Sequence, residues 1–395
     1  MSRRSPPGEA PGRTRGEETM TPPALRLFGA PCSYYTAKVR SALRKQRLPF
    51  REDFQSHPYY RTHVLPVTQN QRIPVLEFAD GPIVQDSTEI LDHLEARDLL
   101  GARPAGVARV VELFVEAYAD RAMLRPAMHY RWNFRAENEA FIIGEFSRLI
   151  AMGDTGKGSE LGRVIAGRMS AYLPPLGITE ATIPAIEAQY LALLDALDRH
   201  FAHHPYLLGG SPSRADYGLM GPLHAHLGRD PHAVPLMQRR APIVYRWTER
   251  MNAGEDTSPE FPDPAPGFEI TADLCPVLDL MAAEFGPELA ATLDLFGTWA
   301  AERTDMPAGT PVSSKGVDQP SFGPVRFDIQ GITFEVMSAG HSLWMLQRVQ
   351  DAFARLDDAE KAEARALLAA GGMARLLDEK MPRRLGRQGN KLTVA

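Results

Sequence analysis

The sequence predicts an α+β protein in which a small mixed domain precedes a larger helical block. Short apolar strands and amphipathic helices alternate over residues 24–100. Apolar residues at helical spacing, without strand signals, then run through residues 105–252, where we expect a single helix at 107–132 and a loop between helices at 154–159. A segment at 253–268 has the composition of a linker, and a mostly helical extension follows at 269–395. Residues 1–23 are rich in Pro, Gly, Arg and Glu, so we expect a disordered tail there.

The first strand and helix of the mixed domain enclose a Cys-Ser pair. Residues 24–29 alternate apolar and polar side chains and end at a glycine, which is typical of a short strand entering a turn. Cys32 and Ser33 follow, and a helical pattern continues to residue 45. We expect Ser33 or Thr36 to cap this helix. Because a helix start carries unpaired N–H groups and partial positive charge, it stabilises a thiolate or a carboxylate.

A second apolar strand, at residues 72–78, contains a proline near its start. Proline is tolerated in a strand only at an edge, at a bulge or as a first residue. We expect the Ile73–Pro74 peptide bond to be cis. The resulting turn would leave the backbone of Val75 free to pair with a peptide ligand.

A hairpin turn at residues 80–81 leads into a short strand and then into a third helix. Asp86 and Ser87 stand at the start of that helix. Its N–H groups can hold a second carboxylate.

This series of motifs, in this order, resembles the glutathione transferase family. The resemblance implies a thioredoxin-like βαβαββα N-terminal domain at 24–100 and an all-helical transferase C-terminal domain at 105–252. Ser33 matches the hydroxyl that donates to the glutathione sulfur in serine-type members. Val75, after Pro74, matches the residue whose backbone pairs with the cysteinyl unit of the tripeptide. Asp86 and Ser87 match the pair that holds its γ-glutamyl end.

A hydroxyl at position 33 suits this chemistry, because a free thiol has a pKa of about 8.5 and the thiolate is the nucleophile. Alternatives are open at both residues of the pair. Ser33 can be a plain helix cap. Cys32 can be a small buried hydrophobe, or it can perform thiol–disulfide exchange, as cysteines at this position do in related classes.

Aromatic residues are the candidates for the wall of an electrophile pocket between the two domains. We expect Tyr34, Tyr130 and Trp132 to serve there, because an aromatic body with a polar tip admits apolar molecules and orients them. The alternative for Tyr130 and Trp132 is ordinary packing between domains. Ser213 and Asp216 stand at capping-box spacing, which predicts a helix start rather than chemistry.

Composition limits the class of protein. The chain has 395 residues, a formal net charge of −5 and two cysteines, Cys32 and Cys275. These values predict a cytoplasmic protein without a disulfide framework and give no basic footprint for nucleic acid. No stretch reaches the roughly 18 apolar residues of a membrane span. We expect no metal, since the histidines at 200, 203 and 204 lack a completing ligand.

The extension resembles tails found on some bacterial transferase-like proteins. Helical periodicity covers residues 276–303, and residues 325–336 alternate like a hairpin around Gln330 and Gly331. Two further helices are predicted at 343–356 and 357–371. We expect this part to cap the helical domain.

The sequence thus predicts a glutathione S-transferase-like enzyme, in which glutathione is the co-substrate and its activated thiol attacks a small electrophile. Family members commonly dimerise, so a homodimer is expected. Two alternatives stay open: a Cys32-dependent glutathione thiol–disulfide oxidoreductase, and a non-catalytic transferase fold that binds a partner.

Overall fold

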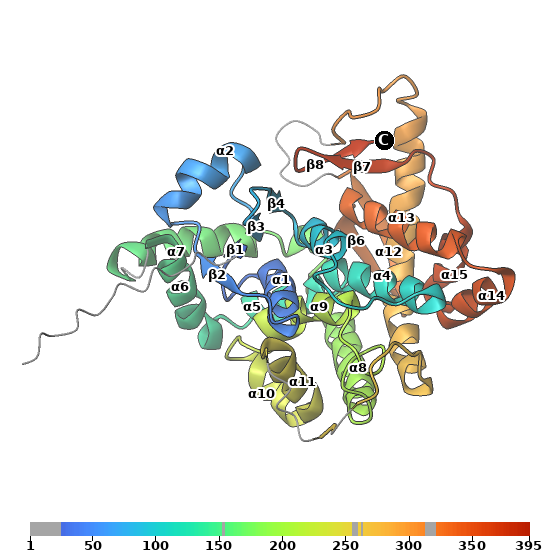
Figure 1. Cartoon of the computed structure of the whole chain (residues 1–395), viewed down its shortest axis with the longest axis horizontal. Helices are drawn as coiled ribbons and strands as arrows, with labels where there is room; N and C mark the ends of the chain where they lie inside the picture. The colour runs from blue at the N-terminus through green and yellow to red at the C-terminus, as the bar shows by residue number, and fades with distance from the viewer. Residues whose placement is uncertain (1–24, 152–154, 255–259, 262–263, 313–320) are drawn as a thin grey trace, which may run out of the picture.

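The computed structural model describes residues 25–151, 155–254, 260–261, 264–312 and 321–395. The tail expected at 1–23 lies outside the described residues, as does part of the linker expected at 253–268. Figure 1 shows the extension, in orange and red, on the right, with the mixed domain, in blue, to its left.

The mixed domain has the predicted βαβαββα order. Its sheet has four strands in the order β2-β1-β3-β4, with β1 parallel to β2 and the other neighbours antiparallel. The Ile73–Pro74 peptide bond, directly before β3, is cis as predicted. The elements are β1 (Leu25–Phe28), α1 (Tyr34–Lys45), β2 (Phe50–Asp53), α2 (Leu65–Thr68), β3 (Val75–Phe78), β4 (Ile83–Gln85) and α3 (Ser87–Ala96).

The second block is helical throughout its described elements, but two details differ from prediction. The single helix expected at 107–132 is broken at Ala122 and Met123, and the loop expected at 154–159 is already helical from Thr155. The capping box of Ser213 and Asp216 is confirmed. The helices are α4 (Gly106–Arg121), α5 (Leu124–Trp132), α6 (Arg135–Ala151), α7 (Thr155–Ser170), α8 (Ile183–Phe201), α9 (Arg214–Met220), α10 (Ala233–Arg240) and α11 (Pro242–Asn252).

The extension contains the predicted helices and hairpin, together with a second hairpin that was not predicted. Gln330 and Gly331 both have positive φ, which is the backbone of a tight two-residue turn. The elements are α12 (Cys275–Ala301), β5 (Pro324–Ile329), β6 (Ile332–Met337), α13 (Gly340–Ala354), α14 (Asp358–Leu367), α15 (Met373–Asp378), β7 (Leu385–Gln388) and β8 (Lys391–Val394).

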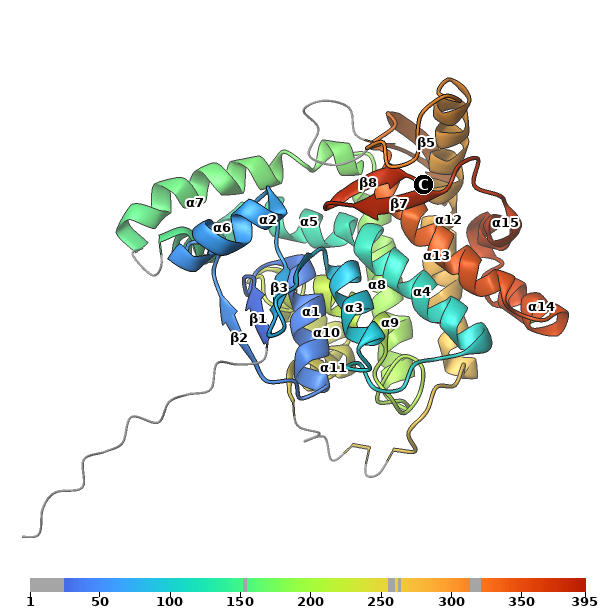
Figure 2. The same cartoon turned by 45° about the horizontal axis from the view of Figure 1, so that its top comes forward.

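The extension shares one apolar core with the rest of the chain. Helix α4 packs between α9 and α13, and α12 packs along α8 and α4, an arrangement that Figure 2 shows from a second side. Buried side chains run through a single cluster from Leu27 in β1, through Phe114 in α4 and Phe285 in α12, to Leu392 in β8. The extension therefore covers the helical domain, as the sequence predicts.

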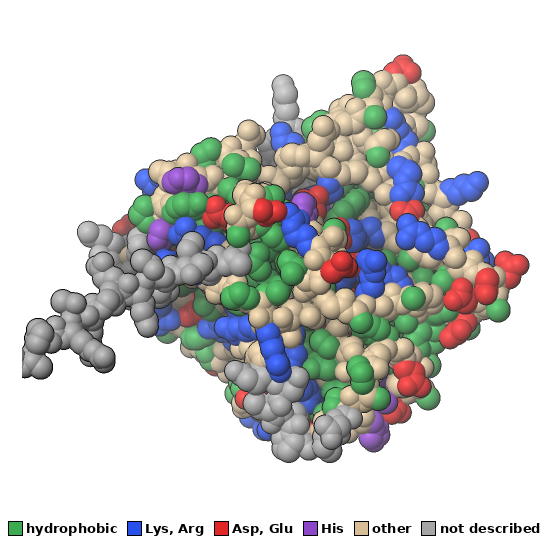
Figure 3. Space-filling view, viewed as in Figure 1, with side chains coloured by type: hydrophobic (Ala, Val, Ile, Leu, Met, Phe, Trp, Pro, Cys, Tyr) green, Lys and Arg blue, Asp and Glu red, His purple; other side chains and the backbone are tan. Residues whose placement is uncertain are grey.

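The outer surface mixes acidic and basic side chains. On the face in Figure 3, acidic groups gather over α14, and hydrophobic side chains lie between charged ones near the centre. Among the described residues, no helix is both long enough and apolar enough to cross a lipid bilayer.

Candidate functional site

Ser33 caps α1, and its hydroxyl is arranged to donate. Its Oγ accepts hydrogen bonds from the backbone N–H of Thr36 at 3.3 Å and from Thr36 Oγ1 at 2.9 Å. These two contacts use the oxygen as an acceptor, so its own proton is available to a ligand. A hydroxyl that accepts from another hydroxyl also becomes a better donor. The first turn of α1 has no acidic residue, so the positive end of the helix is not neutralised locally.

Cys32 lies in an apolar cluster beside this cap. Its side chain is buried with Met128 and Trp132, and its carbonyl oxygen accepts from Arg131 Nη1 at 3.1 Å. Burial raises the pKa of the Cys32 thiol, which the nearby Arg131 charge only partly opposes. The thiol is therefore held in its unreactive form.

A cavity of about 160 Å³ lies where α3 and α4 meet the extension. The predicted residues Pro74, Asp86 and Ser87 line it, whereas Cys32, Ser33 and Val75 are not among its lining residues. Val75 is buried in the sheet between Phe28 and Gln85. The lining residues are Tyr35, Arg72, Ile73, Pro74, Gln85, Asp86, Ser87, Ala117, Asp120, Arg121, Leu124, Ala339, His341, Ser342, Met345, Arg387 and Asn390.

Asp86 caps α3 and carries a charge partner from the extension. Its Oδ1 accepts from the N–H groups of Thr88 at 2.9 Å and Glu89 at 3.3 Å, and its Oδ2 lies 3.4 Å from Arg387 Nη2. Burial works against its charge, but His341, Arg387 and the helix N–H groups favour it and together lower the pKa of Asp86. The carboxylate is therefore ionised at neutral pH.

Asp120, on α4, is a buried carboxylate with one oxygen unused. Its Oδ2 contacts Lys38 Nζ at 2.6 Å and Thr88 Oγ1 at 3.2 Å. Its Oδ1 has no hydrogen-bond partner within the part of the chain that the structure describes. Burial raises the pKa of Asp120 to about 6, although the Lys38 charge opposes the rise. A buried oxygen of this kind is costly unless a ligand satisfies it.

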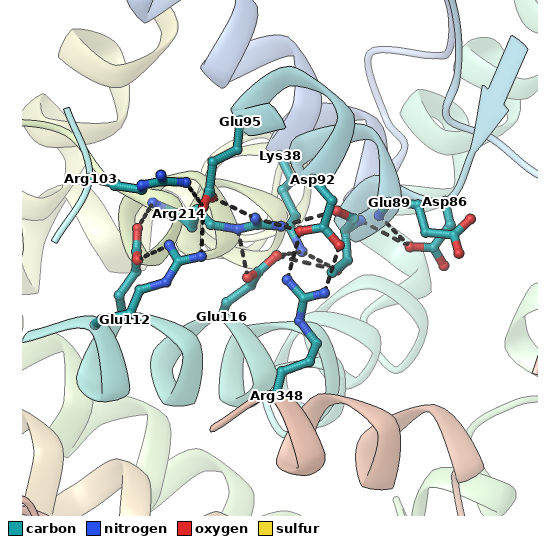
Figure 4. A network of polar contacts seen from close by, with 12 residues as sticks. Lys38, Asp86, Glu89, Asp92, Glu95, Arg103, Glu112, Glu116, Arg214 and Arg348 are labelled. Carbon is teal, nitrogen blue, oxygen red and sulfur yellow. Dashed lines mark hydrogen bonds and ion pairs between the residues drawn. The ribbon is translucent and has the colours of Figure 1, made fainter. Parts of the chain in front are cut away.

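A buried ionic network fixes the start of α3 against the rest of the molecule (Figure 4). Lys38 pairs with Glu116 at 2.8 Å, and Arg214 reaches Glu116 at 3.0 Å and Asp92 at 2.6 Å. Arg348 of α13 also binds Asp92, at 2.6 Å. The network joins α1, α3, α4, α9 and the extension, so the cavity has rigid walls.

Comparison with known proteins accounts for this architecture. Residues 27–99 match the family model described as the glutathione S-transferase N-terminal domain, and residues 180–250 match the C-terminal domain of the same family. The chain therefore contains both domains of the glutathione S-transferase family. No curated protein matches the chain.

Similar solved structures of glutathione S-transferases come from several bacteria. One from Xanthobacter autotrophicus is 19% identical, covering 61% of this chain and 97% of that chain, with a TM-score of 0.30. One from Methylobacterium radiotolerans, in complex with glutathione sulfonate, is 21% identical, covering 62% and 97%, with a TM-score of 0.32. A family member from Pseudomonas fluorescens with two glutathione molecules bound is 16% identical, covering 59% and 90%, with a TM-score of 0.34.

The aromatic residues expected in the electrophile pocket lie elsewhere in this transferase fold. The Tyr34 hydroxyl donates to the carbonyl of Ala119, and Tyr130 stacks on Phe134 in the core. Neither residue lines the cavity between α3 and the extension. Trp132 lines a separate cavity of about 150 Å³ between α5, α6 and α7. Tyr130 therefore packs within the helical domain, which was one of its two alternatives. The Tyr34 ring contacts the helical domain, and its neighbour Tyr35 lines the cavity. A role of Tyr34, Tyr130 and Trp132 in binding an electrophile stays a prediction.

The sequence did not reveal the residues that the extension contributes to the cavity. Arg387 and Asn390 come from the second hairpin, and His341 comes from the start of α13. Gly389 and Asn390 both have positive φ, and a Gly-Asn pair is a known hairpin signal. That signal could have located the hairpin, but not its position over α3.

Proposed function

We propose that this chain is a serine-type glutathione transferase. Glutathione binds with its γ-glutamyl end at Asp86 and Ser87, and the Ser33 hydroxyl donates a hydrogen bond to its sulfur. The presence of both family domains supports glutathione binding. The observation that carries the catalytic assignment is the Ser33 hydroxyl, whose oxygen accepts twice from Thr36 while its proton is left to donate.

The reaction follows from stabilising the glutathione thiolate. A donor at the sulfur and the positive end of α1 favour the charged form, so the thiol ionises nearer neutral pH than its free pKa of about 8.5. The thiolate then forms a carbon–sulfur bond with an electrophile held beside it. A leaving group departs with the electron pair of the broken bond, or a double bond accepts the sulfur and its other carbon takes a proton from water. Ordering the two reactants lowers the barrier. We propose that the apolar wall of the cavity, at Leu124 and Met345, holds the electrophile.

The peptide backbone of glutathione is proposed to pair at the cis-proline turn. Val75 was expected to provide this pairing, but Ile73, which lies in the turn before β3, is the residue that lines the cavity. We therefore place the pairing at the backbone of Ile73, on the other side of Pro74. A homodimer and a cytoplasmic location stay predictions.

The oxidoreductase alternative is weakened by the environment of Cys32. Its side chain is buried and its pKa is raised, whereas a redox cysteine needs a lowered pKa and access to solvent. A non-catalytic transferase fold is the alternative that experiment must separate.

The test is an ultraviolet difference titration of the protein with glutathione near neutral pH, which follows the absorbance of the thiolate. We expect a thiolate signal with the native chain, its loss in Ser33→Ala, and its partial return in Ser33→Thr. Ser213→Ala is the matched control, since it removes the cap of a different helix, α9, leaves the cap of α1 intact, and should keep the signal. An undiminished signal in Ser33→Ala would contradict the assignment, and binding without any thiolate signal would indicate the non-catalytic alternative.

A further inference from the structure

The cavity between α5, α6 and α7 contains a buried hydrogen-bond donor without an acceptor. Trp132, the last residue of α5, lines this cavity of about 150 Å³ and is only 8% exposed. Its indole Nε1 is buried and has no hydrogen-bond partner among the residues that the structure describes. Because an unsatisfied buried donor is costly, a ligand that brings an acceptor to this N–H group gains free energy of binding.

The same cavity carries an excess of positive charge. Arg135 of α6 and Arg163 of α7 line it, and neither forms an ion pair within the described part of the chain. Arg131 also lines the cavity but is already paired with Asp230, at 2.6 Å. Glu139 is the one acidic side chain among the lining residues. Two unpaired guanidinium groups against one carboxylate favour an anion, and a guanidinium matches the two oxygens of a carboxylate.

The rest of the wall is apolar and leaves space for a ring. Ile142, Ile143 and Ala166 line the cavity, and an apolar cavity of about 150 Å³ takes up one benzene molecule. Gly167 lines it too, from inside α7, and a Cβ placed on Gly167 would meet no heavy atom within 4 Å. Since glycine inside a helix is less favourable than alanine, the helix itself gains nothing from this residue. A larger side chain at position 167 would therefore fit and would take up space in the cavity.

We propose that this cavity binds an aromatic carboxylate of one ring, as a second ligand apart from glutathione. The carboxylate accepts a hydrogen bond from Trp132 Nε1 and pairs with Arg135 and Arg163, while the ring packs on the apolar wall. A neutral aromatic amide leaves the two arginines unpaired, and acetate leaves the apolar wall in water, so both should bind more weakly. None of the residues that we assign to glutathione lines this cavity, so the inference does not depend on the proposed function.

The experiment measures the binding of 4-fluorobenzoate to the full chain by fluorine NMR. Benzoate, benzamide and acetate are then compared as competitors, and benzoate should displace the probe at a concentration at least tenfold below that of either other compound. Trp132→Phe keeps an aromatic ring but removes the N–H group, so it should weaken binding of the probe about tenfold. Gly167→Leu fills the cavity and should abolish binding.

Gly297→Leu is the matched control. Gly297 also lies inside a helix, α12, where a Cβ would meet no heavy atom within 4 Å, but it does not line this cavity. The control should bind the probe as the native chain does. The inference is wrong if the native chain does not bind the probe, if benzamide competes as well as benzoate, or if Trp132→Phe or Gly167→Leu keeps the native affinity. Displacement of the probe by glutathione would also contradict it, because the probe would then occupy the glutathione cavity.

Discussion

Cys32 shows how packing decides the chemistry of a residue that the sequence leaves ambiguous. It directly precedes the proposed catalytic serine, yet it lies among apolar side chains, and burial raises its pKa. Cys275 is partly exposed. A thiol reagent such as Ellman's reagent should therefore modify Cys275 quickly in the native protein and Cys32 only after denaturation.

The variants of the two cysteines make this prediction specific. The Cys275→Ser variant keeps only Cys32 and should react slowly with the reagent. The Cys32→Ala variant keeps only Cys275 and should react quickly. Conjugation of glutathione should persist in Cys32→Ala. Rapid labelling of Cys32, or loss of activity in Cys32→Ala, would revive the oxidoreductase alternative.

Asp120 predicts how the affinity for glutathione depends on pH. Its raised pKa of about 6 means that it is largely neutral at pH 5 and charged at pH 7. Asp120 lines the cavity in which we propose that glutathione binds, and the ammonium group of glutathione is favoured there by a charged carboxylate, so affinity should rise about tenfold between pH 5 and pH 7 and then level off. Calorimetry across this range should show the rise in the native chain and a flat, weaker profile in Asp120→Asn.

Other groups near Asp120 titrate outside that window. The pKa of His341 is lowered to about 4 by burial, and the pKa values of Asp86 and Glu116 are also lowered. Burial raises the pKa of Tyr35 far above neutrality, and Lys38 has a raised pKa and stays charged. The groups that face Asp120 are Tyr35 and Lys38 from α1, Asp86 and Thr88 from α3, Glu116 from α4 and His341 from α13. If the affinity of Asp120→Asn still rises between pH 5 and pH 7, another group is responsible for the titration.

At the scale of elements, α12 is joined to α4 and α5 by buried charges. Glu288 accepts from Arg121 Nε and Arg125 Nη1, both at 2.5 Å, and its side chain is 1% exposed. Burial opposes its charge, but the two guanidinium groups outweigh burial and lower the pKa of Glu288. Glu288→Gln removes the carboxylate that the two cations share and leaves only Glu284, 3.6 Å from Arg125, to oppose their charge. We expect it to lower the free energy of unfolding by about 3 kcal/mol at pH 7, as measured with urea.

The sign of the pH dependence follows from the lowered pKa of Glu288. Its stabilisation is present above its unfolded pKa of about 4.3 and is lost as pH falls further, so native chain and Glu288→Gln should converge in acid. Glu335→Gln is the control, because the Arg326–Glu335 pair is exposed and such pairs contribute only about 0–1 kcal/mol. Equal effects of the two substitutions would contradict a structural role for Glu288.

These elements also show what the sequence could and could not predict. The Ser33 cap, the cis bond at Pro74 and the hairpin at Gln330 follow from residues that are close in sequence, and all three are present. The break at Ala122 was missed because apolar helical spacing continues across it. The pairing of Arg387 with Asp86 depends on how the extension docks, which local patterns do not encode. The residues that line the cavity from the extension could therefore be identified only from the structure, whereas Asp86 and Ser87 at the start of α3 were recognised in the sequence.

At the scale of the whole molecule, α4 makes the family domains and the extension depend on each other. Val110, Phe114 and Tyr118 of α4 are fully or almost fully buried, with α9 on one side and α13 on the other. Opening the extension would expose this helix to water, at a cost set by its apolar area. The extension should therefore not unfold separately, even though it lies outside both family models.

Hydrogen exchange measured against denaturant concentration can test this dependence. The amides of α4, α12 and α13 should exchange with the same opening free energy, equal to that of global unfolding, because each helix buries the others. Helix α7 is the internal control, because it packs mainly on α6 and its Leu161 and Val164 are 51% and 49% exposed. Its amides should exchange with a lower opening free energy and therefore at a lower denaturant concentration. If α12 and α13 exchange early while α4 stays protected, the extension is a separate unit and Arg387 is only loosely tied to the ligand site. Joint protection would instead mean that the cavity keeps its extension wall for as long as the chain stays folded.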